Sequence, residues 1–213
     1  MLTLAPELPG AEALIRRAVA AGVVVSLGHS AASYDQAVQA VAAGARHVTH
    51  CFNAMLALHH REPGLVGAAL DLGELTVEAI ADGVHLHPAV VRLLWRACGP
   101  ARVALVSDAV DVELPAGDVE LPGGDVELPG GDAARLADGT LAGSRSGLDA
   151  AVRNVVSWGI DLADALTMAA TTPAKVLGID HTLTVGAAAD LVLLDDALDV
   201  AMTVVGGRVR WER

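Results

Sequence analysis

The chain has 213 residues, of which 53% are hydrophobic, a length and composition that suit one core with at most a small second domain. The formal net charge of −12 argues against a nucleic-acid partner, since neutralising phosphates requires a basic patch. No stretch reaches the ~20 mostly apolar residues of a membrane span, and residues 1–10 lack the features of a secretory signal. We expect a cytoplasmic protein that binds neither nucleic acid nor membrane, with Cys51 and Cys98 reduced.

Short aliphatic runs alternate with helical patterns along the first half of the chain. The predicted strands are a stub at 2–4 and runs at 23–27, 47–51, 75–81 and 102–107. The predicted helices are 11–21, about 33–43 and 88–98, with capping residues at their ends. This alternation predicts an α/β fold with a parallel sheet. Five strands fall short of the eight that close a β/α barrel.

Residues 111–131 form a tandem repeat, DVELPAG, DVELPGG and DVELPGG. Proline and glycine in every unit exclude a helix. One interpretation is a solvated loop or hairpin that grew by duplication, and this is the one we favour. The other is a flap over a functional site, because the repeat begins three residues after Asp108.

The last third of the chain changes character. Helical patterns cover residues 148–158 and 162–170, and a short helix is expected from Thr172-Pro173 to Leu177. Short β-like pieces follow at 189–194, 202–205 and 208–211, with Gly206-Gly207 as a hairpin turn. We therefore predict a barrel portion over 1–180, with the repeat as an insertion, and a small β-domain over 181–213.

Three polar residues, His29, His50 and Asp108, each close an apolar run that is a predicted strand. In a β/α barrel, catalytic groups collect at the C-terminal ends of the strands. Two imidazoles and a carboxylate there can hold a divalent metal and move a proton. A third protein ligand is normally required, and Asp108 and Asp82 are the candidates on this rim. For Asp108 alone, the cap of a following helix is an equally good interpretation.

Eight short motifs then identify a family. They are GHS, THCFNAM, REPG, ADGVH, SDA, GTLAGS, AVRN and PAKVLG. In this order and spacing they resemble the N-acetylglucosamine-6-phosphate deacetylases of the amidohydrolase superfamily, from about Leu2 to the C-terminus with only the repeat interrupting. The resemblance implies roughly the last five strands of a (β/α)8 TIM-type barrel, followed by a piece of a small β-sandwich domain.

The resemblance also implies the chemistry: metal-dependent hydrolysis of N-acetyl-D-glucosamine 6-phosphate to D-glucosamine 6-phosphate and acetate. It makes His29 and His50 metal ligands and Asp108 the catalytic acid and base. Its implied substrate contacts are Asn53, Ala54, Arg61, His85, Leu141, Ala142 and Gly143. The 6-phosphate falls to Arg61 and His85, and Arg61 reaches it across the interface of a homodimer. The implied cofactor is a divalent cation, zinc first, with iron, manganese or cobalt as alternatives.

The chain departs from this family at its start. Family members carry a β-domain segment and the first barrel strands before the equivalent of Leu2, including the glutamate that is the third metal ligand. We expect this chain to lack them. Two alternatives to the deacetylase thus stay open: a truncated, catalytically incompetent member of the family, and an amidohydrolase that acts on another N-acyl amino sugar.

Overall fold

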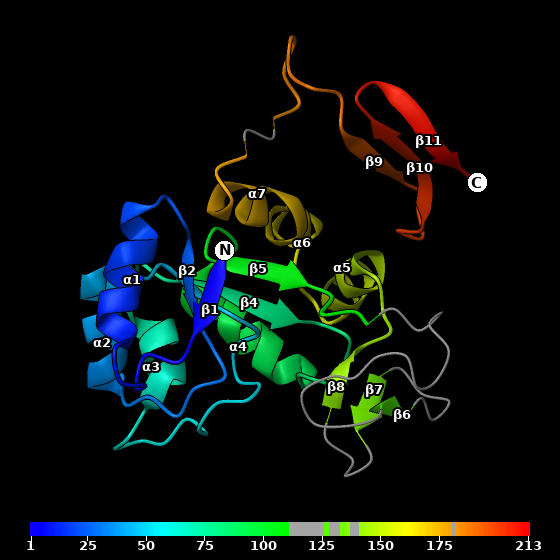
Figure 1. Cartoon of the computed structure of the whole chain (residues 1–213). Helices are drawn as coiled ribbons and strands as arrows, with labels where there is room; N and C mark the ends of the chain where they lie inside the picture. The colour runs from blue at the N-terminus through cyan, green and yellow to red at the C-terminus, as the bar shows by residue number, and fades with distance from the viewer. Residues whose placement is uncertain (111–125, 128–132, 137–140, 180–181) are drawn as a thin grey trace.

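The computed structural model describes residues 1–110, 126–127, 133–136, 141–179 and 182–213. Its main element is a parallel sheet whose strands lie side by side in chain order (Figure 1). These strands are β1 (Leu2–Leu4), β2 (Val25–Leu27), β3 (His47–Val48), β4 (Thr76–Ile80) and β5 (Val103–Val106). The five predicted parallel strands are confirmed, although β2 to β5 are all shorter than predicted, β3 most of all. Within the described residues this sheet does not close into a barrel.

Four helices connect these strands and pack on one face of the sheet (Figure 1). They are α1 (Ala11–Ala20), α2 (Tyr34–Ala43), α3 (Gly64–Asp71) and α4 (Pro88–Cys98). Helix α2 begins as predicted at Ser33, which forms a capping box with Gln36. Helix α3 was not predicted. Its sequence, GLVGAALD, has two glycines, no capping side chain and almost no polar face, so it carries no amphipathic pattern. Six of its eight residues are buried.

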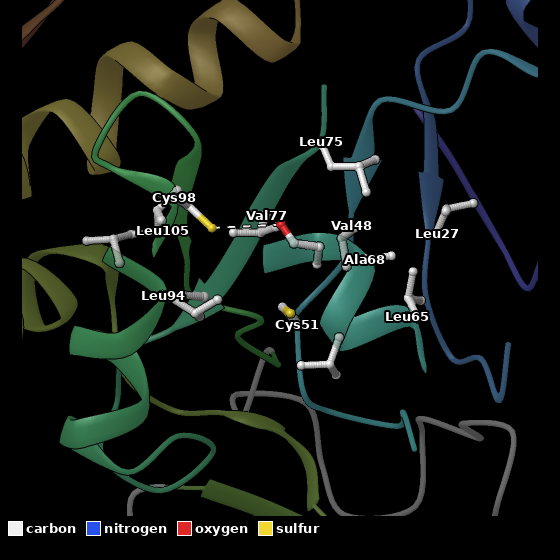
Figure 2. Close-up of a cluster of buried hydrophobic side chains, with 14 of the residues drawn as sticks. Leu27, Val48, Cys51, Leu65, Ala68, Leu75, Val77, Leu94, Cys98 and Leu105 are labelled. Atoms are coloured by element: carbon white, nitrogen blue, oxygen red, sulfur yellow. Dashed lines mark hydrogen bonds between the residues drawn. The ribbon is translucent and has the colours of Figure 1, made fainter. Parts of the chain in front are cut away.

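The hydrophobic core fills the space between the sheet and these helices. Figure 2 shows Leu27, Val48 and Val77 from the strands facing this core together with residues of α3 and α4. Cys51 and Cys98 lie in the same cluster as separate, buried thiols. Burial raises the pKa of Cys51 to about 12, so this thiol stays protonated and unreactive.

The opposite face of the sheet is polar. Since side chains alternate along a strand, the residues next to Leu27, Val48 and Val77 point away from the helices. The members of this polar layer are Thr3, Ser26, His47, Thr49 and Glu78. Hydroxyl oxygens lie 2.6 Å apart between Ser26 and Thr49 and 3.0 Å apart between Thr3 and Thr49. Glu78 Oε1 lies 2.8 Å from His47 Nε2. The sheet therefore has one apolar face and one hydrogen-bonded face.

The helices predicted after the repeat are confirmed, but the last two join into one continuous run. After α5 (Leu148–Ser157), α6 (Leu162–Leu166) passes through a π-helical turn, η1 (Thr167–Thr171), into α7 (Thr172–Val176). The π-helical turn precedes Pro173, which lacks an N–H group to donate to the preceding turn. A wider turn at this point lets the chain continue as a helix past the proline.

Two smaller antiparallel sheets complete the structure. The first consists of β6 (Val126–Glu127), β7 (Ala133–Leu136) and β8 (Leu141–Ser144). Apart from β6, the repeat at 111–131 lies outside the described residues, so neither interpretation of it is tested. The second consists of β9 (Leu191–Leu194), β10 (Val200–Val205) and β11 (Arg208–Glu212). The predicted β10–β11 hairpin is confirmed, with both glycines of Gly206-Gly207 at positive φ. The domain boundary near residue 180 stays a prediction.

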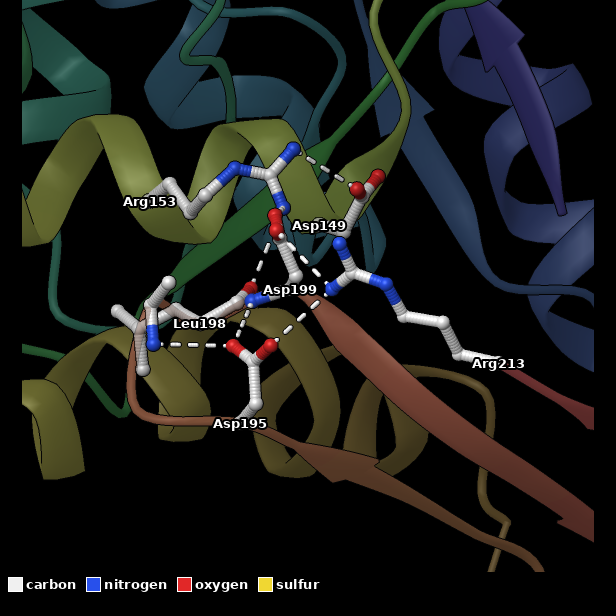
Figure 3. A network of polar contacts seen from close by, with 7 residues as sticks. Asp149, Arg153, Asp195, Leu198, Asp199 and Arg213 are labelled. Carbon is white, nitrogen blue, oxygen red and sulfur yellow. Dashed lines mark hydrogen bonds and ion pairs between the residues drawn. The ribbon is translucent and has the colours of Figure 1, made fainter.

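An ion-pair network joins the C-terminal sheet to α5 (Figure 3). On α5, Arg153 lies 2.9 Å from Asp149 and 3.1 Å from Asp199, which precedes β10. The same Asp199 carboxylate lies 3.4 Å from Arg213. The network therefore ties the loop between β9 and β10 to both α5 and the last residue. Among the described residues, no helix is long and apolar enough to cross a membrane.

Candidate functional site

Three strands of the parallel sheet end in the same unusual way. His29, His50 and Asp108 each lie two residues beyond the last residue of β2, β3 and β5. Their φ angles are 47°, 29° and 48°, in the left-handed region that residues other than glycine rarely adopt. Strained backbone of this kind persists only where the surroundings hold it, and it clusters at functional sites. The predicted rim of polar strand ends is therefore also a rim of special backbone geometry.

The two histidines face each other. His29 Nε2 and His50 Nε2 lie 2.8 Å apart, with the rings edge to face at a centroid distance of 4.6 Å. Burial and the neighbouring His50 lower the pKa of His29, against an opposing effect of Asp108. A lowered pKa favours the neutral imidazole, which is the form that ligates metals. Two ring nitrogens directed at one point fit two ligands of a divalent cation.

The third ligand is missing from the described part of the chain, where no three His, Cys, Asp or Glu side chains are placed to hold a metal. Asp82, one of our two candidates for the third ligand, already forms hydrogen bonds within its own turn. Its Oδ1 accepts hydrogen bonds from the backbone N–H groups of Val84 and His85, and its Oδ2 lies 2.6 Å from His85 Nδ1. Burial raises the pKa of Asp82, but these hydrogen bonds outweigh it and bring the pKa to about 2. The Asp82 carboxylate therefore stabilises the turn that leads to His85 rather than serving as the third ligand.

Asp108 is exposed at the end of its strand. No helix follows it in the described residues, so the helix-cap interpretation is wrong. Instead the chain pairs with β8: Ser144 N–H donates to the Asp108 carbonyl at 2.8 Å, and Val110 N–H donates to the Ser144 carbonyl at 3.1 Å. Asp108 is thus held through its backbone, which leaves its carboxylate open to a ligand.

The segment Leu141-Ala142-Gly143, predicted to contact the sugar, lies in β8 beside Asp108. Gly143 has a φ of 141°, and a Cβ atom there would lie 2.9 Å from the Asp108 carbonyl oxygen and 2.7 Å from Val110 Cγ1. Only glycine fits so close to the backbone. The structure therefore brings this segment and Asp108 together.

Asn53 and Ala54 lie one turn beyond His50. Asn53 donates from Nδ2 to the His50 carbonyl at 3.3 Å, and the carbonyl of Ala54 accepts the N–H of Ser30 at 3.0 Å. Ala54 is also left-handed, with a φ of 51°. The second of these bonds joins the segments that follow the two histidines, so both predicted substrate contacts are next to the histidine pair.

His85 and Arg61, the two predicted phosphate contacts, differ in their burial: the His85 ring is buried and Arg61 is exposed. Because Asp82 engages Nδ1 of the buried His85 ring, the other nitrogen, Nε2, is left without a hydrogen-bond partner among the described residues. Arg61 lies on an exposed loop, where its Nη1 is 2.9 Å from His60 Nε2. No contact joins Arg61 to the other candidate residues in the described part of this single chain.

Two carboxylates near the histidines escaped the sequence analysis. Glu7 accepts the Ser30 hydroxyl and the Ala31 N–H, both at 2.7 Å. Glu78 lies 2.8 Å from His47 Nε2 and accepts the His50 N–H at 3.0 Å. For both groups burial raises the pKa and the hydrogen bonds lower it, with a net shift below the ordinary value. For Glu78, a charge within the apolar run LTVEAIA was the available signal.

Comparison with known proteins places this chain in a family. Residues 6–210 match the amidohydrolase family. The chain belongs to the amidohydrolase family. It is 41% identical to the N-acetylglucosamine-6-phosphate deacetylase of Danio rerio, with 100% of this chain and 55% of that protein aligned. It is 42% identical to the N-acetylgalactosamine-6-phosphate deacetylase of Escherichia coli O157:H7, over 98% of this chain and 56% of that protein.

Solved deacetylase structures of the family share the fold of this chain. The N-acetylglucosamine-6-phosphate deacetylase of Thermotoga maritima superposes with a TM-score of 0.92 at 35% identity, over 100% of this chain and 59% of that one. A mutant of the Mycobacterium smegmatis enzyme in complex with N-acetyl-D-glucosamine-6-phosphate gives a TM-score of 0.89 at 39% identity, over 97% of this chain and 56% of that one. This amidohydrolase chain therefore spans somewhat more than half the length of these relatives.

Proposed function

We propose that this chain takes part in catalysing the metal-dependent hydrolysis of an N-acetylated amino sugar 6-phosphate. The proposed substrate is N-acetyl-D-glucosamine 6-phosphate. The observation that carries the proposal is the convergence of His29 Nε2 and His50 Nε2, 2.8 Å apart, at the strand ends. Support comes from relatives at 41–42% identity whose names give this class of reaction. The proposal includes a cytoplasmic location, as the sequence composition suggests, and a homodimeric whole protein, as the family resemblance implies.

His29 and His50 would hold the cation through their Nε2 atoms, with a further ligand from outside the described residues. A divalent cation bound there supplies the Lewis acidity that activates water and polarises the amide carbonyl. Zinc, which imidazole ligands suit, is the first candidate, and iron, manganese and cobalt are the alternatives.

Asp108 moves the proton in this scheme. Its carboxylate takes a proton from the attacking water and returns it to the leaving amine nitrogen, so that the amide yields acetate and the free amino sugar. Its exposed position and its backbone bonds to β8 suit this role, because no described residue forms a hydrogen bond or ion pair with the carboxylate. Leu141, Ala142 and Gly143 would close on the sugar beside it.

In this scheme His85 and Arg61 bind the phosphate group. The Asp82 carboxylate fixes the ring of His85 through Nδ1, so Nε2 is the nitrogen that can meet a phosphate oxygen. A guanidinium group such as that of Arg61 offers a planar set of donors that suits phosphate. Asn53 and Ala54, beside the histidine pair, would complete the contacts through side-chain and backbone groups.

Acetate release from phosphorylated and unphosphorylated N-acetylglucosamine, with Zn²⁺ supplied, tests the proposal. We expect turnover of the phosphorylated sugar that Asp108→Asn lowers by ~10²-fold or more, while the exposed control Asp35→Asn leaves it unchanged. Arg61→Ala should raise KM for the phosphorylated sugar and spare kcat. An equal loss on both sugars would contradict the phosphate role. No turnover with metal supplied would favour the incompetent member of the family.

The second substrate candidate is N-acetylgalactosamine 6-phosphate. It is favoured by the Escherichia coli O157:H7 relative, which carries that name at 42% identity. The two sugars differ only at one ring carbon, so the same assay with both compounds compares them directly. A higher kcat/KM for the galactosamine compound would transfer the proposal to that substrate.

A further inference from the structure

We propose that Glu78, backed by His47, is a positioning residue that aims His50 at the metal. The inference rests on the proposed function of His50 as a ligand. Neither residue matches one of the motifs or substrate contacts considered above. The structural basis is that the Glu78 carboxylate contacts both the buried His47 ring and the backbone N–H of His50, the candidate metal ligand.

Glu78 holds the chain on both sides of His50. From β4, its Oε2 accepts the His50 N–H at 3.0 Å, and its own carbonyl accepts the Cys51 N–H at 2.9 Å. Its Oε1 lies 2.8 Å from Nε2 of His47, three residues before His50. The contacts of this one residue therefore span the whole of residues 47–51, where β3 ends and the chain turns.

Burial strengthens these contacts of Glu78. The side chain of His47 is only 2% exposed and that of Glu78 15% exposed, so water competes little for either group. A hydrogen bond to a carboxylate is about twice as strong as one between neutral groups. The His47 ring, fixed in the polar layer, in turn limits the rotamers that the Glu78 side chain can adopt.

His50 needs such a hold because its backbone is strained. Its φ of 29° is unfavourable for a residue with a Cβ atom and persists only where neighbours maintain it. The backbone conformation at His50 sets the direction of its ring, and hence the 2.8 Å approach of its Nε2 to that of His29. Loss of the Glu78 acceptor would let the backbone relax and the ring turn away.

A simpler role for Glu78 would be to satisfy the buried His47 ring alone. That role requires only Oε1, whereas Oε2 is directed at the His50 N–H. The two roles separate experimentally when the pair is replaced as a unit. Removing His47 and Glu78 together leaves no orphaned imidazole, but it still removes the acceptor for the backbone of His50.

The experiment uses the ¹⁵N-labelled 213-residue chain and its variants Glu78→Met, His47→Phe/Glu78→Met and Glu78→Gln. Exposed Glu74→Gln, in the loop before β4, is the matched control. NMR reports the His50 amide proton shift, the ring-to-ring contact of His29 and His50, and Zn²⁺ titration at these two rings. We expect Glu78→Met and the double variant to lose the ring contact and to bind Zn²⁺ ~10–100-fold more weakly.

Glu78→Gln keeps an oxygen that can accept the His50 N–H, so most of the ring contact and of the Zn²⁺ affinity should return. Its neutral acceptor should still move the His50 amide proton upfield, and Glu74→Gln should change nothing. An unchanged amide shift in Glu78→Gln would overturn the proposal. So would a folded double variant with wild-type ring contact. If the wild-type rings do not respond to Zn²⁺, the proposed metal role fails, and the amide shift and ring contact still decide the positioning role.

Discussion

At the scale of single residues, the site is held by contacts to backbone groups rather than by the functional side chains themselves. The Asp108 carbonyl bonds to Ser144, the His50 N–H to Glu78, and the Ser30 N–H to Ala54. Left-handed residues need such external support, because their conformation is unfavourable in isolation. Among the described residues, the rings of His29 and His50 contact each other and the Asp108 carboxylate has no hydrogen-bond partner, while the backbone beneath all three is fixed.

Gly143→Ala tests this support at Asp108. The added Cβ would meet the Asp108 carbonyl oxygen at 2.9 Å, in a backbone conformation with a φ of 141°. We expect the Ser144-to-Asp108 hydrogen bond to break and the free energy of unfolding to fall by about 1–3 kcal/mol, measured by urea denaturation. Gly73→Ala is the control, since nothing lies within 4 Å of its added Cβ. Equal effects of the two substitutions would contradict the close approach.

Asp82→Asn tests the turn that carries His85. The folded-state pKa of Asp82, about 2, lies below its ordinary value of 3.8, so folding favours the carboxylate. Its stabilising contribution is therefore complete above the ordinary pKa and is lost as the pH falls through that value toward the folded one. We expect Asp82→Asn to cost about 2 kcal/mol near neutral pH.

The difference between wild type and Asp82→Asn should narrow by about 1 kcal/mol from about pH 6 to about pH 3 in urea unfolding curves. Asp196→Asn, at an exposed position in the loop between β9 and β10, serves as the control. A difference that stays constant over this pH range would show that the Asp82 carboxylate is not what stabilises the turn.

At the scale of elements, Glu7 joins two loops at the C-terminal end of the sheet. It lies in the connection from β1 to α1, and it accepts the Ser30 hydroxyl and the Ala31 N–H of the connection from β2 to α2. The second loop contains His29 directly before Ser30. The loop after β1 thus restrains the segment that directs the ring of His29.

Glu7→Ala should remove both acceptors and leave the buried Ser30 hydroxyl short of a partner. We expect a loss of about 1–3 kcal/mol in the free energy of unfolding and faster hydrogen exchange at Ala31. The control is Glu12→Ala, which breaks an exposed ion pair with Arg16 worth at most about 1 kcal/mol. If Glu7→Ala costs no more than the control, the loops are held by other contacts.

Sequence patterns predicted elements whose ends carry chemical signals and missed those that depend on tertiary contacts. Helix α2 was predicted because Ser33 caps it, whereas α3 has no cap and is defined by burial on nearly all sides. The proximity of His29 and His50 followed from their positions at strand ends. The supporting roles of Glu7 and Glu78 did not, because they depend on pairing between residues 23 or more positions apart.

At the scale of the whole molecule, Arg153 is the main polar link between α5 and the C-terminal sheet. It donates to the Leu198 carbonyl at 3.2 Å, besides its ion pairs with Asp149 and Asp199 (Figure 3). Leu198 has a φ of 62°, so this bond also supports a strained turn. The position of the three-stranded sheet on the rest of the chain thus depends on a partly exposed charge network.

We expect Arg153→Gln to lower the free energy of unfolding by about 1 kcal/mol and to speed hydrogen exchange in β10. The stability difference should shrink at high salt, because salt screens partly exposed charges. Arg16→Gln, whose ion pair lies within α1, should leave exchange in β10 unchanged. Unaltered exchange in β10 of Arg153→Gln would show that apolar contacts alone hold the sheet.

The polar layer also bears on self-association and aggregation. Both outer strands of the main sheet, β1 and β5, pair on one side only within the described residues, and such edges can template the addition of another strand. Face-to-face stacking of sheets is a separate route, and fibrils need dry, apolar faces for it. Stacking on the polar layer would bury the hydroxyl groups of Thr3 and Thr49 against another copy. The chain should accordingly lengthen its sheet at the edges more readily than it layers sheets upon one another.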